Sequence, residues 1–561
     1  MKFVKALILS LIAVCISRAS GENVILSAMQ SELNRSMENL VMEEGERPYF
    51  ISYWVYEYAS FALEASMGCL TDQDDGHYRV LNVDVRVGDY EFDNSGGKEK
   101  KWWQLEDEDR KYRNMQVPID DDTVALKHRL WLVTDHKYKK ALEDYGNKKK
   151  EKALSVEDAE DTTPDFSKEE PEVYAGDEVS LSIDRNAWEQ RIKNLSKLFT
   201  EYEDITISRV GFKARAKNNY FVNSEGSKIQ KGNALYSIDI EVQSRSDDGM
   251  PLTDHLKFCS TDGDFDFPRI EAEIADMADR LTALKQAEEC ESYIGPVLIA
   301  SPGSGAFVAE VLVPLLSASK KLWKDGGELK NKVGQRIMSA SISVFDDPAL
   351  DSYQRQALAG HYQFDNQGVA ARRVDLVENG VLRGFLLSRS PVKGFEKSNG
   401  HGRTNGVQAG NLFVKSSSPQ SFPQLKNRLM SECRKQGKSY GYMVTSALLP
   451  ESSVSGVVFT SSGSDGGGRP AMSRFKPVEV YKVYTDGRQE LERGMEVMAG
   501  SPLSMLSKIK ALGNDPGVWT VDYGTASIVA PSILVSELEV RKASGGEQTQ
   551  PILPAPGEAV E

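Results

Sequence analysis

The six histidines of this chain limit the metal and nucleophile chemistry that its sequence can support. None of them is followed by Glu, so the HExxH pattern, in which two imidazoles share a helix face with a general base, is absent. The phosphate-binding GxxxxGK[ST] loop is missing as well. Gly463–Arg469 is rich in glycine but lacks the lysine, so we expect a flexible loop there. Ser317–Lys320 matches SxxK without the companion SDN and KTG motifs, which favours a chance match.

Length and charge bound the class of protein. The chain has 561 residues and a formal net charge of −15, with 40% hydrophobic and 27% charged residues. This composition is typical of a globular protein, and the length suggests about two to four domains. The acidic balance disfavours nucleic acid as a partner, because phosphate backbones are bound by basic surfaces.

The first 19 residues have the pattern of a secretory signal peptide. Lys2 and Lys5 precede the apolar stretch Ala6–Ile16, and small residues follow at Ser17 and Ala19. The stretch is too short to span a bilayer, and no later segment is long and apolar enough, so we predict no membrane span. We therefore expect a secreted or periplasmic protein.

Four cysteines remain after the signal segment: Cys69, Cys259, Cys290 and Cys433. They allow three disulfide pairings in an oxidising compartment. No two of them form a CxxC motif, which excludes zinc-ribbon and thioredoxin-like sites. We expect buried thiols, with one disulfide as the alternative.

Periodicity places the elements that must position any site. Apolar spacing predicts helices over Asn23–Glu44, Thr123–Tyr145, Ala187–Tyr202, Arg269–Ser292, Gly305–Lys320, Phe422–Gln436 and Pro502–Lys510. Alternation predicts strands over Tyr49–Tyr58, His77–Val87, Ile205–Ala214, Asn219–Val222 and Leu235–Gln243, and strand patterns dominate after Pro296.

Composition divides the chain further. A charged insertion covers about residues 94–175, and its mixed-charge run Asn147–Glu172 is typical of a solvated linker or mobile arm. The helix predicted over Arg269–Ser292 separates a domain over 22–292 from another over 293–543. Residues 544–561 are rich in Pro, Gly and Glu, so we expect a disordered tail.

The most informative block runs from Asp346 to Asn405. Asp365–Gly368 (DNQG) has turn chemistry. Asn379-Gly380, between Val374–Val377 and Val381–Leu387, is a strong hairpin pattern. On pattern alone, both are structural features of a β-rich domain.

This block resembles the TldD/PmbA family, also called modulators of DNA gyrase. The corresponding motif residues are Asp346-Asp347, Gly360, Asp365 and Gly368, then Val377–Leu386, then Ser398–Arg403 with His401. The resemblance extends over about Ile294–Val540. It implies an α+β architecture with an N-terminal mixed α/β domain, a β-rich, barrel-like antiparallel C-terminal domain, and a dimer. It also gives Asp365, Gly368, Asn379, Gly380, His401 and Arg403 as candidate binding residues.

In the catalytic branch of that family, an HExxxH helix and a later Cys bind zinc, and unfolded peptide is cleaved. Here the HExxxH positions fall on Ala309–Pro314, where Ala309 and Pro314 replace the histidines and Glu310 alone remains. The Cys should fall within Gly517–Tyr523, which contains none. One carboxylate cannot hold Zn²⁺, so the resemblance implies a branch without the standard zinc. Glu310 is then a catalytic relic or a solvated side chain.

We therefore expect no cofactor, with zinc as the alternative. A replacement metal site from His361, Asp365 and His401 is that alternative, although loop histidines more often hold backbone groups.

Three functions fit these observations. The first is a secreted family member that binds extended polypeptide by β-augmentation, as a scaffold or as the partner subunit in a homodimer or a heterodimer with a second family member. The second is an active periplasmic peptidase with a rearranged site. The third is a structural protein of envelope assembly.

Overall fold

The computed structural model describes residues 23–43, 45–96, 107–154, 162–320, 323, 327–404, 406–448, 472, 475–520 and 525–543. The predicted signal segment, the Gly463–Arg469 loop and the predicted disordered tail lie outside these residues. In the described part of the chain, no helix combines the length and apolar character that crossing a membrane requires.

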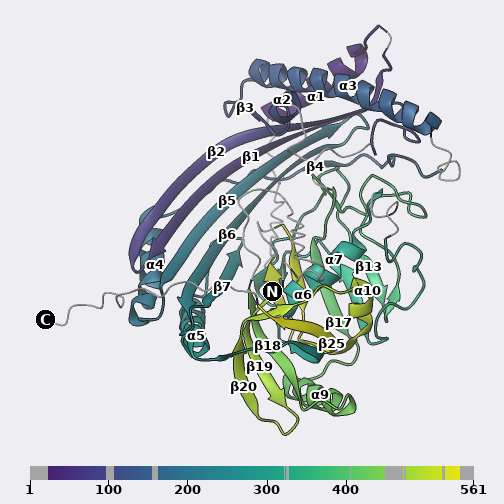
Figure 1. Ribbon diagram of the computed structural model, residues 1–561. Coiled ribbons are helices and arrows are strands. Elements are labelled where there is room, and N and C mark those ends of the chain that lie inside the picture. The colour runs from purple at the N-terminus through teal and green to yellow at the C-terminus, as the bar shows by residue number, and fades with distance from the viewer. Residues whose placement is uncertain are drawn as a thin grey trace, which may run out of the picture.

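A seven-stranded sheet dominates the N-terminal half, with strand order β3-β2-β1-β5-β6-β4 and β7 paired to β6. Its strands are β1 (Pro48–Ser66), β2 (Cys69–Val87), β3 (Met115–Val117), β4 (Val173–Ala175), β5 (Ile207–Asn223), β6 (Lys228–Arg245) and β7 (Pro251–Ser260). The long strands are antiparallel, and they curve around the C-terminal half of the molecule (Figure 1).

The strands predicted over Ile205–Ala214 and Asn219–Val222 are one continuous strand, β5, so the predicted break was wrong. Arg215 and Lys217 lie between the two predicted strands. In the structure, they alternate with the buried Ala216 and point to the opposite face of the sheet. When only apolar residues are used to predict strands, a strand with one apolar and one basic face is predicted as two shorter strands.

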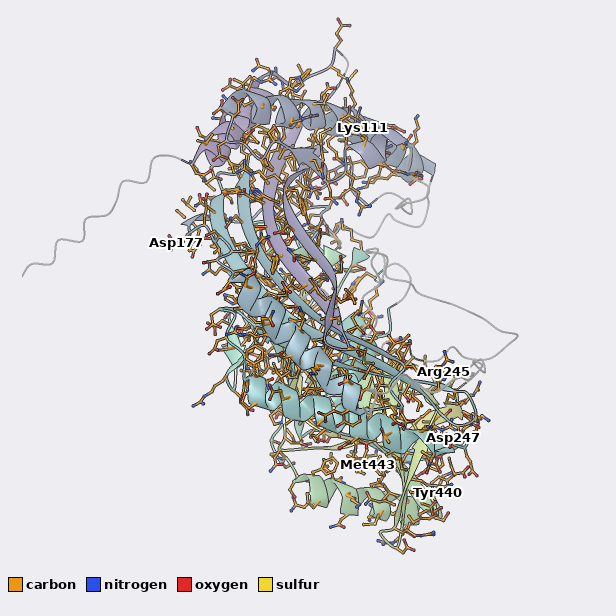
Figure 2. All side chains as sticks on the ribbon, turned by 90° about the vertical axis from the view of Figure 1, so that its left-hand side faces the viewer. Lys111, Asp177, Arg245, Asp247, Tyr440 and Met443 are labelled. Carbon is orange, nitrogen blue, oxygen red and sulfur yellow. The ribbon has the colours of Figure 1, made fainter. Side chains whose placement is uncertain are left out.

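Helices cover the outer face of this sheet, the side turned away from the C-terminal half. They are α1 (Val24–Asn39), α2 (Asp107–Lys111), α3 (Thr123–Leu154), α4 (Arg185–Lys197) and α5 (Phe267–Lys285). Tyr53 and Val55 of β1 belong to the core beneath α1 and α3, and Phe61 and Leu63 to the core beneath α4 and α5. Figure 2 looks onto this face and shows α4 and α5 lying across it. The four helices predicted in this half are confirmed, with shifted ends.

Two sheets form the C-terminal half, with the strand orders β21-β25-β9-β18-β19-β20-β8, with β22 on β25, and β14-β13-β10-β17-β24-β23. The first comprises β8 (Glu288–Glu289), β9 (Tyr293–Ile299), β18 (Tyr440–Leu448), β19 (Lys476–Tyr484), β20 (Gln489–Arg493), β21 (Met495–Val497), β22 (Ile509–Leu512) and β25 (Ile533–Lys542). The second comprises β10 (Ile342–Asp346), β13 (Val374–Glu378), β14 (Val381–Leu382), β17 (Asn411–Ser416), β23 (Gly517–Thr520) and β24 (Ser527–Ala530).

Short ladders and helices complete this half: β11 (Ser352–Tyr353), β12 (Gln356–Ala357), β15 (Gly402–Arg403), β16 (Gly406–Val407), α6 (Ser304–Val311), α7 (Val313–Leu316), α9 (Phe422–Lys435) and α10 (Pro502–Ser507). The predicted α+β class with a barrel-like C-terminal part is confirmed. Its expected antiparallel character holds in most pairs, but β9–β18, β17–β24 and β8–β20 are parallel.

The run Asn147–Glu172 was expected to be a solvated linker, and its described parts are instead packed. Residues up to Leu154 continue α3. Asp165 is buried and forms ion pairs with Lys148 of α3 and Lys320 of the C-terminal half. The prediction of a solvated linker from composition was wrong for these described parts, because charges of this segment are balanced by partners that are distant in sequence. The segment therefore links the two halves.

All four cysteines of the described chain are free thiols, and the expected burial holds for two of them. Cys290 and Cys433 are buried, whereas Cys69 is exposed. Burial raises the pKa of Cys433 to about 11, so the thiolate form that would ligate a metal or attack an electrophile is disfavoured.

Candidate functional site

The helix that corresponds to the family's HExxxH segment is shorter than predicted. It ends at Val311, and α7 starts anew at Val313, because Pro314 has no N–H for a continuous helix. Ala309 is buried, Glu310 is half-buried and Pro314 is exposed. Of these three side chains, Glu310 alone carries a metal-binding atom.

The segment expected to supply the cysteine, β23, lies beside α6. A Cβ atom added to Gly305 of α6 would lie 2.3 Å from Cβ of Trp519, so an indole packs where the helix passes. The local donor set therefore does not fit a zinc centre of the family type. Among the described residues, no group of three His, Cys, Asp or Glu side chains is arranged to hold a metal ion.

His401 and Asp346 join two of the family-motif loops. Nε2 of His401 lies 3.0 Å from Oδ1 of Asp346, and Nδ1 lies 3.0 Å from Oδ1 of Asn399. Nδ1 of His361 lies 3.0 Å from the carbonyl oxygen of Pro348 instead. Both imidazoles thus contact the end of β10 or the segment that follows it, His401 through the Asp346 carboxylate and His361 through the Pro348 carbonyl.

Asp365 organises the turn that follows. Its Oδ1 accepts hydrogen bonds from the backbone N–H groups of Gln367 (2.8 Å) and Val369 (2.9 Å), and its Oδ2 accepts one from Gly402 (2.8 Å). Burial still raises the pKa of Asp365, despite these bonds. The predicted turn is confirmed, and it brings Asp365 next to the Gly402–Arg403 strand.

At Gly368, this turn packs closely against the N-terminal sheet. Its φ of 78° is in the left-handed region, and an added Cβ would lie 2.3 Å from the Phe221 ring. Asn379 and Gly380 have φ values of 49° and 79° and form the predicted hairpin turn between β13 and β14. A Cβ on Gly380 would instead meet the backbone oxygen of Met338 at 2.4 Å. These two candidates belong to a structural turn and not to the group around Asp365.

The sheet presents a distinct set of side chains to these loops. In β1, Trp54, Tyr56 and Tyr58 alternate with the residues of the outer cores and therefore lie on the opposite face, here called the inner face. Tyr56 shares a side-chain hydrogen bond with Thr404. Trp54 and Phe364 pack in one cluster that spans both halves.

Three cations converge where the inner face meets the loops; Lys217, Lys231 and Arg403 are called the cation cluster below. The Lys217 ammonium lies 4.4 Å from the Tyr56 ring centroid and 5.4 Å from that of Tyr58. The Arg403 guanidinium lies 3.7 Å from the Tyr362 ring centroid. Lys231 lies 5.9 Å from the same centroid and donates to the carbonyl of Phe364.

The electrostatics of the cation cluster are unfavourable for its lysines. Burial, followed by Arg403 and Arg215, lowers the pKa of Lys217 to about 8. Burial, followed by Arg403 and Lys217, lowers the pKa of Lys231 to about 7, and Asp365 opposes this shift. Perturbed pKa values of this size gather at functional sites more often than elsewhere.

Of the predicted site residues, the structure brings Asp365, Gly368, His401 and Arg403 into one region. Sequence reasoning missed Lys217, Lys231 and Tyr56. The i, i+2 spacing of Lys213, Arg215 and Lys217 could have indicated a basic strand face, but the loop that meets it lies far along the chain.

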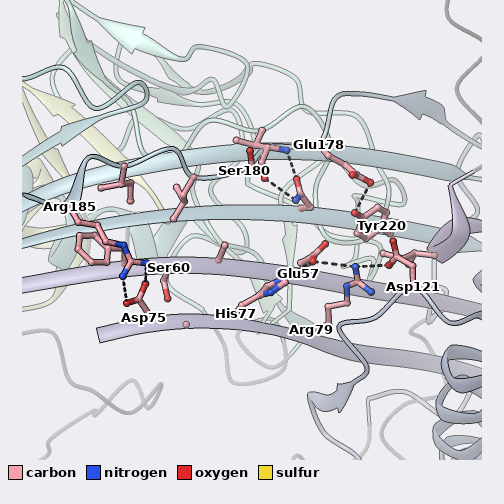
Figure 3. Close-up of a pocket in the computed structure, with 18 residues that line it drawn as sticks. Glu57, Ser60, Asp75, His77, Arg79, Asp121, Glu178, Ser180, Arg185 and Tyr220 are labelled. Atoms are coloured by element: carbon pink, nitrogen blue, oxygen red, sulfur yellow. Dashed lines mark hydrogen bonds and ion pairs between the residues drawn. The ribbon is translucent and has the colours of Figure 1, made fainter. Parts of the chain in front are cut away.

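A cavity of about 780 Å³ lies on the outer face, between α1 and α4 (Figure 3). Most of its charged groups are already paired with one another, for example Arg79 with Glu57 (3.2 Å) and Asp121 (2.8 Å), and His77 with Glu57 (2.8 Å). A ligand there would compete with these ion pairs. The inner face, whose cations are less compensated, is the stronger candidate.

Comparisons with known proteins bear on the C-terminal half most directly. Residues 292–458 match the family model described as the PmbA/TldA metallopeptidase C-terminal domain. A metalloprotease of Methanocaldococcus jannaschii is 23% identical over 60% of this chain and 66% of its own length. A zinc metalloprotease TldD homolog of Saccharolobus solfataricus is 22% identical over 61% of this chain and 72% of its own length. A further metalloprotease, from Methanothermobacter thermautotrophicus, is matched over 40% of its own length.

Solved structures share the fold over nearly the whole chain. A putative modulator of a DNA gyrase from Thermotoga maritima covers 92% of this chain, with 99% of its own length matched, a TM-score of 0.58 and 17% identity. TldE from Thermococcus kodakarensis covers 91%, with 99% of its own length matched, a TM-score of 0.59 and 12% identity. The family model, the sequence relatives and this shared fold all support the TldD/PmbA family as the one that this chain resembles.

Proposed function

We propose that this protein binds polypeptide as a scaffold or as a partner subunit, without the zinc centre of the family's peptidases. The observation that carries the proposal is the set of side chains at the expected ligand positions: Ala309 and Pro314 have no metal-binding side-chain atom, and Glu310 is the one residue of the HExxxH motif that is kept. A single carboxylate does not hold Zn²⁺.

The inner face is the proposed polypeptide site. Tyr58 offers aromatic surface there beside the buried Tyr56, and Tyr78 is 42% exposed and stacks on Tyr58 with ring centroids 5.1 Å apart. Trp54 Nε1 and Asn219 Oδ1 are buried without a hydrogen-bond partner among the described residues. A peptide backbone supplies both the acceptor and the donor that these atoms lack.

A free sheet edge borders this face. β3 pairs with β2 at Arg79–Leu81, and no strand of the described chain pairs with the same edge of β2 over Cys69–Tyr78. An extended peptide could add there by β-augmentation. Asp72, Asp74 and Asp75 lie on this segment and would favour basic or neutral peptides.

The proposed partner is a second family member or a second copy of this chain. The structural likeness to TldE supports a role within a family assembly. We also propose a secreted or periplasmic location, which rests on the signal-peptide pattern of residues 1–19.

Zinc analysis of the purified protein, combined with an assay on a denatured protein substrate, tests the proposal. We expect substoichiometric zinc, binding of the substrate and no cleavage. Stoichiometric zinc with cleavage would establish the rearranged peptidase instead. If cleavage is found, the variants Glu310→Gln and His401→Ala would show which of the two groups it needs. A Glu310 carboxylate without a catalytic role can be replaced with no change in peptide binding or cleavage.

Partner capture gives a second measurement. Light scattering of the chain alone and after mixing with a family member that carries an intact HExxxH separates the homodimer from the heterodimer. A monomer under both conditions would contradict the partner role.

A further inference from the structure

The cation cluster stands out in a chain whose formal charge is −15. Its cations are half-buried, whereas the fully buried arginines of the described chain have carboxylate partners, such as Arg389 with Glu225 (2.7 Å) and Arg86 with Asp93 (2.7 Å). Within the described residues, neither Lys217 nor Arg403 has a carboxylate within ion-pairing distance, and Lys231 bonds to a backbone carbonyl. Asp365 acts on Lys231 and Arg403 from beyond ion-pairing distance, so three cations share one carboxylate. Removing incompletely compensated charge from water is unfavourable, so such a cluster is retained where a further anion completes it.

We propose that Lys217, Lys231 and Arg403 bind a carboxylate, and that this is the C-terminal carboxylate of the bound polypeptide. The inference rests on the proposed function and names the part of the ligand that the site recognises. A guanidinium can hold the two carboxylate oxygens together, while the ammonium groups approach as point charges.

The strand registers place the remaining recognition groups around this point. Tyr56 is paired with Asn219 across β1 and β5, and Asn219 is paired with Lys231 across β5 and β6. Tyr58 is paired with Lys217 in the next row of the same face. Neighbouring strands lie about 4.8 Å apart. The side chains of these two rows are therefore spaced closely enough to contact one peptide residue and its carboxylate together.

The unpartnered atoms fit the last residue of a chain. Its amide N–H can donate to Oδ1 of Asn219, and a carbonyl oxygen can accept from Nε1 of Trp54. The rings of Tyr56 and Tyr362 provide apolar walls beside the cations.

A monoanion suits the site better than a phosphate dianion. Asp365 is the carboxylate that acts on Lys231, and its position is fixed by backbone N–H groups, so it remains in the site and repels added negative charge. Phosphate is therefore the contrasting probe in the test.

The test compares two fluorescent decapeptides of identical neutral sequence, one a free acid and one a C-terminal amide. We expect the wild-type protein to bind the free acid about tenfold tighter or more, as for a charge-assisted hydrogen-bonded group. Lys217→Gln and Arg403→Gln should bring the ratio toward one. Lys213→Gln removes the same charge from an exposed position on the same strand face and should preserve the ratio.

The outcomes separate the two proposals. Equal binding of acid and amide by the wild-type protein would overturn the carboxylate site and leave polypeptide binding standing, and this comparison needs no variant to fold. Failure of both peptides to bind would overturn the proposed function and the site with it. Displacement of the free acid by inorganic phosphate at equal or lower concentration would assign the cluster to phosphate and overturn the carboxylate specificity.

Discussion

Nε2 of His401 lies 3.0 Å from Oδ1 of Asp346, and both side chains are completely buried although 55 positions separate them in sequence. The pair holds the loop that carries Arg403 against the start of the 346–351 loop. Asp346 also accepts from the backbone N–H of Gly410 (3.1 Å to Oδ2), so both its oxygens have partners. This pair therefore stabilises the two loops that face the inner face of the sheet.

Replacing His401 with Ala leaves Asp346 buried without its main partner. We expect a loss of about 3 kcal/mol in the free energy of unfolding, because the carboxylate is left uncompensated. Urea unfolding measures it. His361→Ala, which removes a half-buried ring whose Nδ1 contacts one carbonyl, should cost about 1 kcal/mol. Equal losses, or a loss of bound zinc on either substitution, would favour a metal site over this structural role.

Gly368→Ala tests the contact between the turn and the sheet. Gly368 and Gly334 have nearly the same φ, 78° and 79°, but an added Cβ meets Phe221 at 2.3 Å in the first case and nothing within 4 Å in the second. Gly334→Ala should cost about 1 kcal/mol through its positive φ alone. Gly368→Ala should cost about 1–3 kcal/mol more, because a packed interface resists overfilling. Similar unfolding midpoints for the two variants would show that the two halves separate freely at this point.

Lys217→Met should stabilise the protein at neutral pH. The native pKa of Lys217 is lowered from 10.5 to about 8, so between these values the native state binds fewer protons than the unfolded state, and wild-type stability rises with pH. The buried charge therefore destabilises most below pH 8. We expect a gain of about 1–2 kcal/mol at pH 7 that shrinks as pH rises toward 10.5.

Thermal unfolding followed over this pH range measures the gain, with Lys213→Met as the control at an exposed position of the same face. Destabilisation by Lys217→Met at every pH would mean that the ammonium already has an anionic partner in the isolated protein.

Binding of the free-acid peptide should weaken as the lysines lose their protons. The groups that face them are Tyr56, Tyr58 and Arg215 from the sheet, and Tyr362, Asp365 and Arg403 from the loops. The pKa values of about 7 for Lys231 and about 8 for Lys217 predict a loss of about tenfold or more between pH 7 and 9.

Calorimetry in buffers of different ionisation enthalpy should show proton uptake on binding near pH 8, because a bound carboxylate favours the protonated ammonium groups. Binding without net proton uptake would remove Lys217 and Lys231 from the site.

Local sequence determined much of the scaffold. Turn residues such as Asn379-Gly380 and Asp365–Gly368 specify their own backbone angles, because positive φ and side-chain-to-backbone hydrogen bonds are local properties. Helical apolar spacing found α1, α4 and α5 for the same reason. The motif residues indicated the family, and the absence of His at 309 and 314 is visible in sequence alone.

Only the tertiary structure decided where the chemistry gathers. Lys217 and Lys231 meet Arg403 because two strand registers and the packing of Gly368 on Phe221 bring together residues up to about 190 positions apart, which no local pattern encodes. The same long-range contacts turned the expected linker around Asp165 into a buried connection between the two halves. Burial of charge depends on what the rest of the chain places around it, so sequence alone could not distinguish an exposed basic strand face from a half-buried cation cluster.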